Sequence, residues 1–216
     1  MTIAIANSGQ TGSTAAATLS ITTPTAGNIL VCFIDQVGGG PSNTPTLTGW
    51  TINATPALYA SSADTVWAAY KIASGSETSI APTAGSSGTI DGICYWEISG
   101  AKNPIALDGS PVANSNLGAF TTGAINYTTS VAGSIVLMGV GSAASSGGQN
   151  AWLSSTSTIA TNIGTAASRC FGGSYITTTT ITTAQFEASW LNSHNFGMLG
   201  IALEANQGAD MMAAFL

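Results

Sequence analysis

The stretch Ala26-Gly-Asn-Ile-Leu-Val-Cys-Phe-Ile34 decides the fold, because a similar stretch, Ala132-Gly-Ser-Ile-Val-Leu-Met-Gly-Val140, follows 106 residues later (132 − 26). Each is a short apolar run after a glycine-containing turn, which is typical of a buried strand. Around them, runs rich in Val, Ile, Thr, Tyr and Trp alternate with loops rich in Gly, Pro, Ser and Asn. No segment indicates a long helix, so the sequence predicts an all-β chain.

Further landmarks indicate an internal duplication. They pair Trp50 with Trp152, Tyr70 with Tyr175 and Glu97 with Glu204, at offsets of 102, 105 and 107. We therefore expect one domain over residues 1–206, with pseudo-repeats at about 15–105 and 121–205. Two copies of about four antiparallel strands predict a β-sandwich, a jelly roll built from two Greek-key halves.

Strand geometry extends the last of these pairs. Because side chains alternate between the two faces of a strand, Trp96 and its match Leu203 share one face, and Glu97 and Glu204 lie on the other. We expect Trp96 in the core and both glutamates in contact with solvent.

The charge content is unusually low. Only 6% of the 216 residues are charged, against about 25% in ordinary domains, and Lys71, Lys102 and Arg169 are the whole basic inventory. Three cations do not neutralise the phosphates of a nucleic acid, and they form no polybasic membrane surface. A surface of Thr, Ser, Asn and Gly instead suits packing against neighbouring subunits, since few charges need desolvation.

The N-terminal residues and the apolar runs bear on where the chain is made. No run reaches the ~20 apolar residues of a membrane span, and residues 1–6 lack the basic and apolar regions of a signal peptide. We therefore expect a chain made in a host cytoplasm, without contact to a membrane.

A set of motifs resembles a known module. After residues 26–34 come Thr48-Gly-Trp50-Thr, Val66-Trp-Ala-Ala-Tyr-Lys-Ile-Ala73, Ser76-Glu77-Thr78 and Trp96-Glu-Ile-Ser-Gly-Ala-Lys-Asn-Pro104-Ile. Over residues 15–205 this is similar to jelly-roll-like β-sandwich modules of tailed-phage virion structural proteins, which also occur in bacterial surface and secreted proteins. The chain departs from that pattern at Asn28, where Asp is more usual, and at Leu107, which stretches the element before Asp108.

The residues that carry chemistry are few. Cys32, Cys94 and Cys170 have no C-x-x-C spacing, so we expect buried free thiols, although one disulfide among them stays open. The lone histidine, His194, lies in a predicted loop without a G-x-S-x-G motif, and the carboxylates show no paired spacing. We predict no enzyme, no catalytic residue, no cofactor and no metal site, while calcium at the loop aspartates stays open.

Two groups of residues are candidates for contacts. Trp67, Trp190 and His194 are predicted to be exposed and to meet a ligand or partner. The tail of residues 207–216 is apolar and is predicted either to cap its own domain or to dock on a neighbouring subunit through Met211, Met212, Phe215 and Leu216.

Taken together, these features favour a phage virion structural protein, a head decoration, fibre or tail component. We expect it to form a homo-oligomer and to contact other virion proteins, with a host-surface glycan as a further partner left open. The alternative is a carbohydrate- or surface-binding module of a bacterial cell-surface protein. An enzyme on the same scaffold ranks third, because it requires converging carboxylates in a cleft.

Overall fold

The computed structural model describes residues 2–11, 17–60, 63–115, 120–142, 149–154, 161–163, 170–180 and 184–206. Every regular element in these ranges is a β-strand, and all strand pairs are antiparallel. The all-β prediction is therefore confirmed. These described ranges hold no helix long and apolar enough to cross a membrane.

The strands divide between a first half, residues 2–99, and a second half, residues 112–206. In the first half they are β1 Ala4–Gln10, β2 Leu19–Ser20, β3 Ile29–Val37, β4 Thr51–Ile52, β5 Ala57–Tyr59, β6 Asp64–Ile72, β7 Ser79–Ile80 and β8 Thr89–Ser99. In the second half they are β9 Val112–Ser115, β10 Phe120–Tyr127, β11 Ile135–Ser142, β12 Gln149–Ser154, β13 Thr161–Ile163, β14 Cys170–Ile176, β15 Ala184–His194 and β16 Phe196–Leu203.

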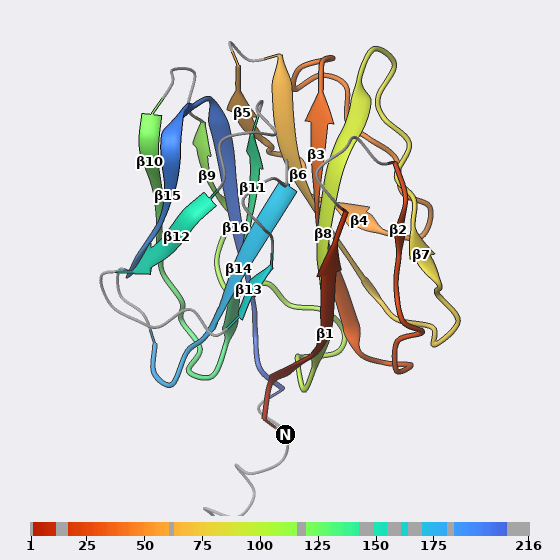
Figure 1. The fold of residues 1–216 in the computed structure, drawn as a ribbon. Coiled ribbons are helices and arrows are strands. Elements are labelled where there is room, and N and C mark those ends of the chain that lie inside the picture. Colours follow the sequence, from red (N-terminus) through yellow and green to blue (C-terminus); the bar gives the residue numbers. More distant parts are fainter. Residues whose placement is uncertain are drawn as a thin grey trace, which may run out of the picture.

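Each half forms a large inner sheet from its own strands. The order is β1-β8-β3-β6-β4 in the first half, where β5 also pairs with β6, and β13-β14-β11-β16-β9 in the second. The two inner sheets face each other, with β3 against β11, β8 against β14 and β6 against β16 (Figure 1). By their order in the sheets, β6 is equivalent to β14 and β8 is equivalent to β16. The packing is therefore reciprocal, because β6 contacts β16 and β8 contacts β14.

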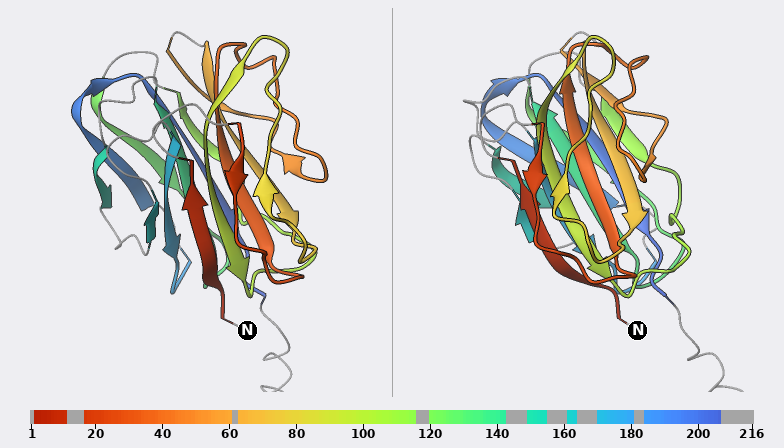
Figure 2. Two further views of the ribbon diagram at one scale, coloured as in Figure 1. Left: turned by 45° about the vertical axis from the view of Figure 1, so that its right-hand side comes forward. Right: turned by 90° about the vertical axis from the view of Figure 1, so that its right-hand side faces the viewer.

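Each inner sheet carries a smaller outer sheet on its far side. This outer sheet is β2–β7 in the first half and β10-β15-β12 in the second, and Figure 2 shows the warm-coloured first half beside the cool-coloured second half. Along β3, Val31 and Phe33 belong to the central core, whereas Cys32 and Ile34 pack under the first outer sheet. Both faces of β3 are thus buried, which explains its continuous apolar sequence.

The strand pairings of the two halves recur at a constant shift. β2 pairs with β7 through Leu19 and Ile80, and β10 pairs with β15 through Ile125 and Phe186. Both members of the second pair lie 106 residues after those of the first (125 − 19 and 186 − 80). The same shift relates the pairing of β5 with β6 to that of β13 with β14.

The stretches that start β3 and β11 match in their backbone too. β3 begins at Ile29 and β11 at Ile135, and the glycine two residues before each strand has a positive φ, 89° at Gly27 and 81° at Gly133. A residue with a Cβ is strained in this left-handed conformation. The turn therefore needs glycine in both halves.

The predicted face of Trp96 is confirmed, since its side chain lies in the central core together with Leu203. The alignment within these strands differs from the expected one. In their pairing with the central strands, Ile98 and Leu203 occupy equivalent positions, and so do Trp96 and Ile201. A shift of two residues keeps every side chain on the same face.

Large side chains of the first half occupy the space over glycines of the second half. A Cβ on Gly139 would lie 2.1 Å from Cγ of Phe33, and one on Gly172 would lie 2.1 Å from Cη2 of Trp96. The two aromatic rings meet edge to face, with centroids 5.8 Å apart. We call this contact between the inner sheets, formed by Phe33, Trp96, Gly139 and Gly172, the seam.

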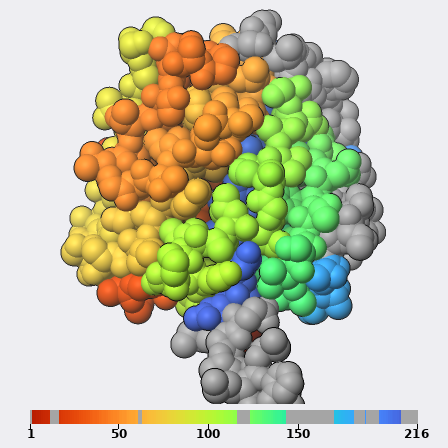
Figure 3. All heavy atoms as spheres, turned by 180° about the vertical axis from the view of Figure 1, so that it is seen from behind, coloured from red at the N-terminus to blue at the C-terminus, as the bar shows by residue number. Residues whose placement is uncertain are grey.

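Residues 100–111 link the halves and lie along the end of β16. The backbone N–H of Lys102 donates to Glu204 O at 2.9 Å, and that of Asp108 donates to Ala202 O at 3.0 Å. The Lys102 ammonium also pairs with the Glu204 carboxylate at 2.7 Å. In Figure 3 the green linker runs between the orange first half and the teal second half.

Gly139→Val should lower the free energy of unfolding by at least about 3 kcal/mol, because the added methyl groups overlap the Phe33 ring. Phe33→Ala alone should cost about 3–5 kcal/mol. The double variant should be less destabilised than the sum of the two single costs, by about 1 kcal/mol or more, because removal of the Phe33 ring makes room for the valine. Urea unfolding of the four proteins measures this coupling.

Glu204→Gln, on the linker side of the molecule, serves as the control and should add to Gly139→Val without coupling. Strict additivity of Gly139→Val with Phe33→Ala would contradict the packing described for the seam.

Candidate functional site

Glu97 is a buried structural group and does not contact solvent as predicted. Its side chain is only 4% exposed. Its Oε1 atom accepts hydrogen bonds from the Thr25 backbone N–H at 2.8 Å and from Asn28 Nδ2 at 2.6 Å. The prediction is wrong because residues 25–28, the turn before β3, cover this face of β8.

Asp108 is a buried carboxylate that accepts several hydrogen bonds. It is 1% exposed and accepts from Ser130 N and Oγ, both at 2.7 Å, from Val131 N at 3.0 Å and from Ser134 Oγ at 2.6 Å. Burial alone would raise the pKa of Asp108, but these hydrogen bonds from Ser134, Ser130 and Val131 hold it below the usual value.

The two carboxylates serve equivalent turns. Val131 and Ser134, which donate to Asp108, lie 106 residues after Thr25 and Asn28, which donate to Glu97. The acids come from different elements, one from β8 and the other from the linker. We call them the turn carboxylates.

Asp35 and Tyr59 form a second buried polar pair. Both are 0% exposed, and the Tyr59 hydroxyl donates to the Asp35 carboxylate. Burial, followed by the charge and hydrogen bond of Asp35, raises the pKa of Tyr59 well above its usual value. The pair lies between the inner sheets, where a Cβ on Gly141 would be 2.6 Å from Asp35 Oδ1. A substrate in solvent does not reach this position.

Glu77 organises the loop after β6. It pairs with the Lys71 ammonium at 2.6 Å and accepts from the Ser74 backbone N–H at 2.9 Å. Burial alone would raise the pKa of Glu77, but Lys71 and the backbone donors lower it far below its usual value. This carboxylate therefore acts as a loop anchor.

Trp67, one of the residues predicted to be exposed, is buried. Trp67 is only 1% exposed, and its Nε1 donates to Thr65 Oγ1 at 2.9 Å. Its predicted exposure is wrong, because the outer sheet, through Leu19 and Ile80, packs over this face of β6. No periodicity in the sequence signals this cover, since β2 and β7 are each two residues long.

Trp190 and His194 both belong to β15, so His194 ends a strand and does not lie in the predicted loop. Their backbones pair with Gln149 and Phe120 respectively, while their side chains lie outside what the structure describes. The tail residues Met211, Met212, Phe215 and Leu216 also lie outside the described residues.

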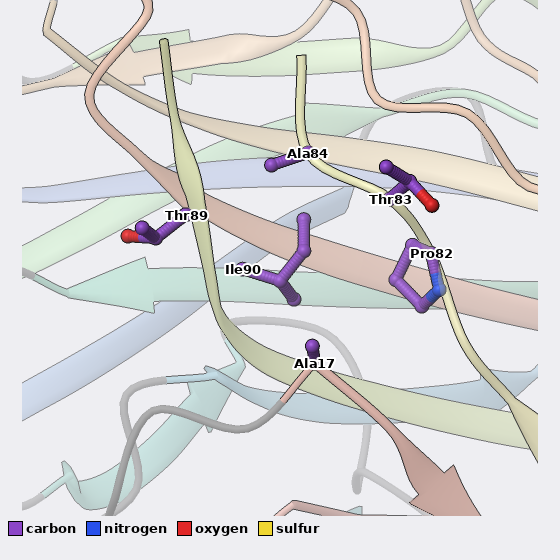
Figure 4. A pocket seen from close by; sticks show the side chains of 6 residues that line it. All are labelled: Ala17, Pro82, Thr83, Ala84, Thr89 and Ile90. Carbon is purple, nitrogen blue, oxygen red and sulfur yellow. The ribbon is translucent and has the colours of Figure 1, made fainter. Parts of the chain in front are cut away.

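A shallow groove is present on the outer side of the first half. Its volume is about 450 Å³, and Ile90 lies at its centre (Figure 4). The lining residues are Ala17, Pro82, Thr83, Ala84, Thr89 and Ile90. These side chains offer small apolar groups and two hydroxyls, and they suit a packing contact better than the orientation of a polar substrate.

The donor sets for metals and disulfides are limited. Among the residues that the structure describes, no three His, Cys, Asp or Glu side chains are grouped as a metal site requires. Cys32, Cys94 and Cys170 are buried free thiols, as the sequence predicts.

Comparison of the chain with models of protein families, with curated protein sequences and with solved structures finds no match. The function must therefore be argued from the residues and their contacts.

Asp108→Asn should lower the free energy of unfolding by about 2–4 kcal/mol, because the amide presents an N–H₂ group to donors that need an acceptor. Glu204→Gln is the matched control. It removes a half-exposed ion pair with Lys102 and should cost at most about 1 kcal/mol. Urea unfolding near neutral pH measures both, and equal effects would contradict the role assigned to Asp108.

The contribution of Asp108 should also depend on pH. Its pKa is lowered in the folded state, so its stabilisation is complete above the unfolded-state pKa of about 3.9 and is lost as the pH falls towards the folded-state value. The wild type should therefore lose more stability than Asp108→Asn between about pH 6 and pH 2. Urea midpoints across this range test it, and a gap that stays constant would contradict it.

Proposed function

We propose that this chain is a non-enzymatic structural protein of a tailed-phage virion, a head decoration, fibre or tail component, which acts by packing against other subunits. The observation that carries the proposal is how its acidic groups are used. Hydrogen bonds or ion pairs from the chain's own groups engage the carboxylates of Asp35, Asp64, Glu77, Glu97, Asp108 and Glu204. A catalytic carboxylate must instead face its substrate.

The charge-poor surface supports the same proposal. The chain has 3 basic and 9 acidic residues in 216, several acids are turned inward, and the exposed residues that the structure describes are chiefly Thr, Ser and Ala. Such a surface packs against a neighbour with little desolvation of charge. The resemblance of residues 15–205 to virion modules agrees with this role.

We infer further that the facing sheets form a β-sandwich of two related halves, each with the strand order of a jelly roll. In each half the first, eighth, third and sixth strands lie side by side in the inner sheet, and the second and seventh pair in the outer sheet. This order arises when one long antiparallel hairpin is rolled up. It favours two jelly rolls over the single one expected from the sequence.

The alternative, a glycan-binding module, depends on exposed aromatic side chains. Trp67 does not supply an exposed aromatic side chain, because it is buried. Among the predicted contact residues, Trp190 and His194 on β15 then carry this alternative.

Deletion of residues 207–216 should convert an oligomer into a folded monomer, because the apolar tail is proposed to dock on a neighbouring subunit. The matched control replaces Met211, Met212, Phe215 and Leu216 by serine and keeps the length of the tail. Native mass spectrometry measures assembly, and far-UV circular dichroism measures folding. A wild-type chain that stays monomeric and binds glycans in a screen would favour the alternative, and an unfolded deletion variant would favour a capping tail.

A further inference from the structure

Two thiols from different halves meet across the seam. Cys94 lies on β8 and Cys170 begins β14, and their sulfur atoms are 3.6 Å apart. Both side chains are at most 1% exposed. They are 76 residues apart in sequence (170 − 94), so a bond between them would join the two halves covalently.

The backbone near these thiols allows a close approach. A Cβ on Gly92, two residues before Cys94 on the same face of β8, would lie 2.6 Å from Cβ of Cys170. Only glycine at position 92 lets β14 come this near to β8. The Cys170 thiol also contacts Phe33 O at 3.6 Å, which places it in the central core.

The third cysteine has a different place. Cys32 packs under the first outer sheet, whereas Cys94 faces the central core. Their strands are neighbours, with Phe33 opposite Cys94, but the two side chains point to opposite faces of the same sheet. A disulfide between Cys32 and Cys94 would need one strand to turn over, because the geometry of the bond is narrow.

We propose that Cys94 and Cys170 are a disulfide-forming pair that links the two halves when the chain meets a small-molecule disulfide such as oxidised glutathione. A thiolate attacks the small disulfide, forms a mixed disulfide and releases one reduced thiol. The second cysteine then attacks the mixed disulfide, forms the Cys94–Cys170 bond and releases the second small thiol. The two cysteines lose two protons and two electrons in all, and the reagent gains them to become two thiols. This inference does not depend on the virion role.

The same burial sets the rate of the reaction. Burial raises the pKa of Cys170 well above its usual value, and the thiolate is the attacking form. The exchange therefore requires a transient opening of the seam, which sub-denaturing urea accelerates. Once formed, the bond restrains the unfolded chain over a long loop and should raise the melting temperature by about 5–15 °C.

The sequence makes the test direct, because trypsin cleaves after Lys71, Lys102 and Arg169. The three cysteines then fall in separate peptides, residues 1–71, 72–102 and 170–216. The reduced full-length chain is incubated with oxidised glutathione at about pH 8.5, with and without sub-denaturing urea. The expected result is one linked pair, peptides 72–102 and 170–216, with a mass two hydrogens lower, together with the rise in melting temperature.

Matched variants give the controls. Cys32→Ser should keep the linked pair, and both Cys94→Ser and Cys170→Ser should lose it. The peptide map of the wild type decides the question even where a variant does not fold. Linkage through peptide 1–71, or glutathione adducts without any intrachain bond after prolonged incubation in urea, would overturn the proposal.

Discussion

The seam, where Phe33 and Trp96 pack over glycines, is the contact on which the rest of the structure depends. Phe33 and Gly139 are equivalent positions of the two halves (139 − 33 = 106), and β3 faces β11. Because β3 and β11 are equivalent strands that face each other, a residue at the centre of this contact lies against the residue at the equivalent position of the other half. Two phenylalanines would overlap there and two glycines would leave a void, and protein interiors tolerate neither. The halves must therefore differ at this point, and Asp35 over Gly141 repeats the pattern.

This divergence extends to the turn carboxylates. On β16 the position equivalent to Glu97 is Ala202, so β16 supplies no acid to the turn before β11. The linker provides Asp108 instead, and its backbone N–H is bonded to Ala202 O. One electrostatic requirement, an acceptor for the N–H groups of a tight turn, is met by two different elements. Asn28 and Asp108 are thus hydrogen-bonding groups of these two turns.

The sequence predicts the features that depend on the local pattern of apolar residues. It does not predict which faces of the strands are buried by segments that pack over them. Alternation placed Trp96 in the core, and the apolar run of residues 29–34 indicated a buried strand. The exposure expected for Trp67 and Glu97 was wrong, because the covering segments are the two-residue strands β2 and β7 and the turn of residues 25–28. Segments this short carry no periodicity. Most contacts of the candidate site, those of Glu97 above all, join residues distant in sequence and carry no motif.

The inward use of charge also determines how an assembly of this protein would form. Interfaces rich in complementary charge associate quickly because long-range attraction steers the partners. A chain with 3 basic residues and a net charge of −6 has little to offer for such steering between identical copies, and like charge opposes it. Association should then proceed at about 10⁵–10⁶ M⁻¹s⁻¹, the range for partners without steering. Added salt should strengthen it by screening the repulsion. Specificity in such an assembly rests on the shape of hydroxyl-rich surfaces, and those surfaces can be rigid because the seam and the turn carboxylates hold the strands in place.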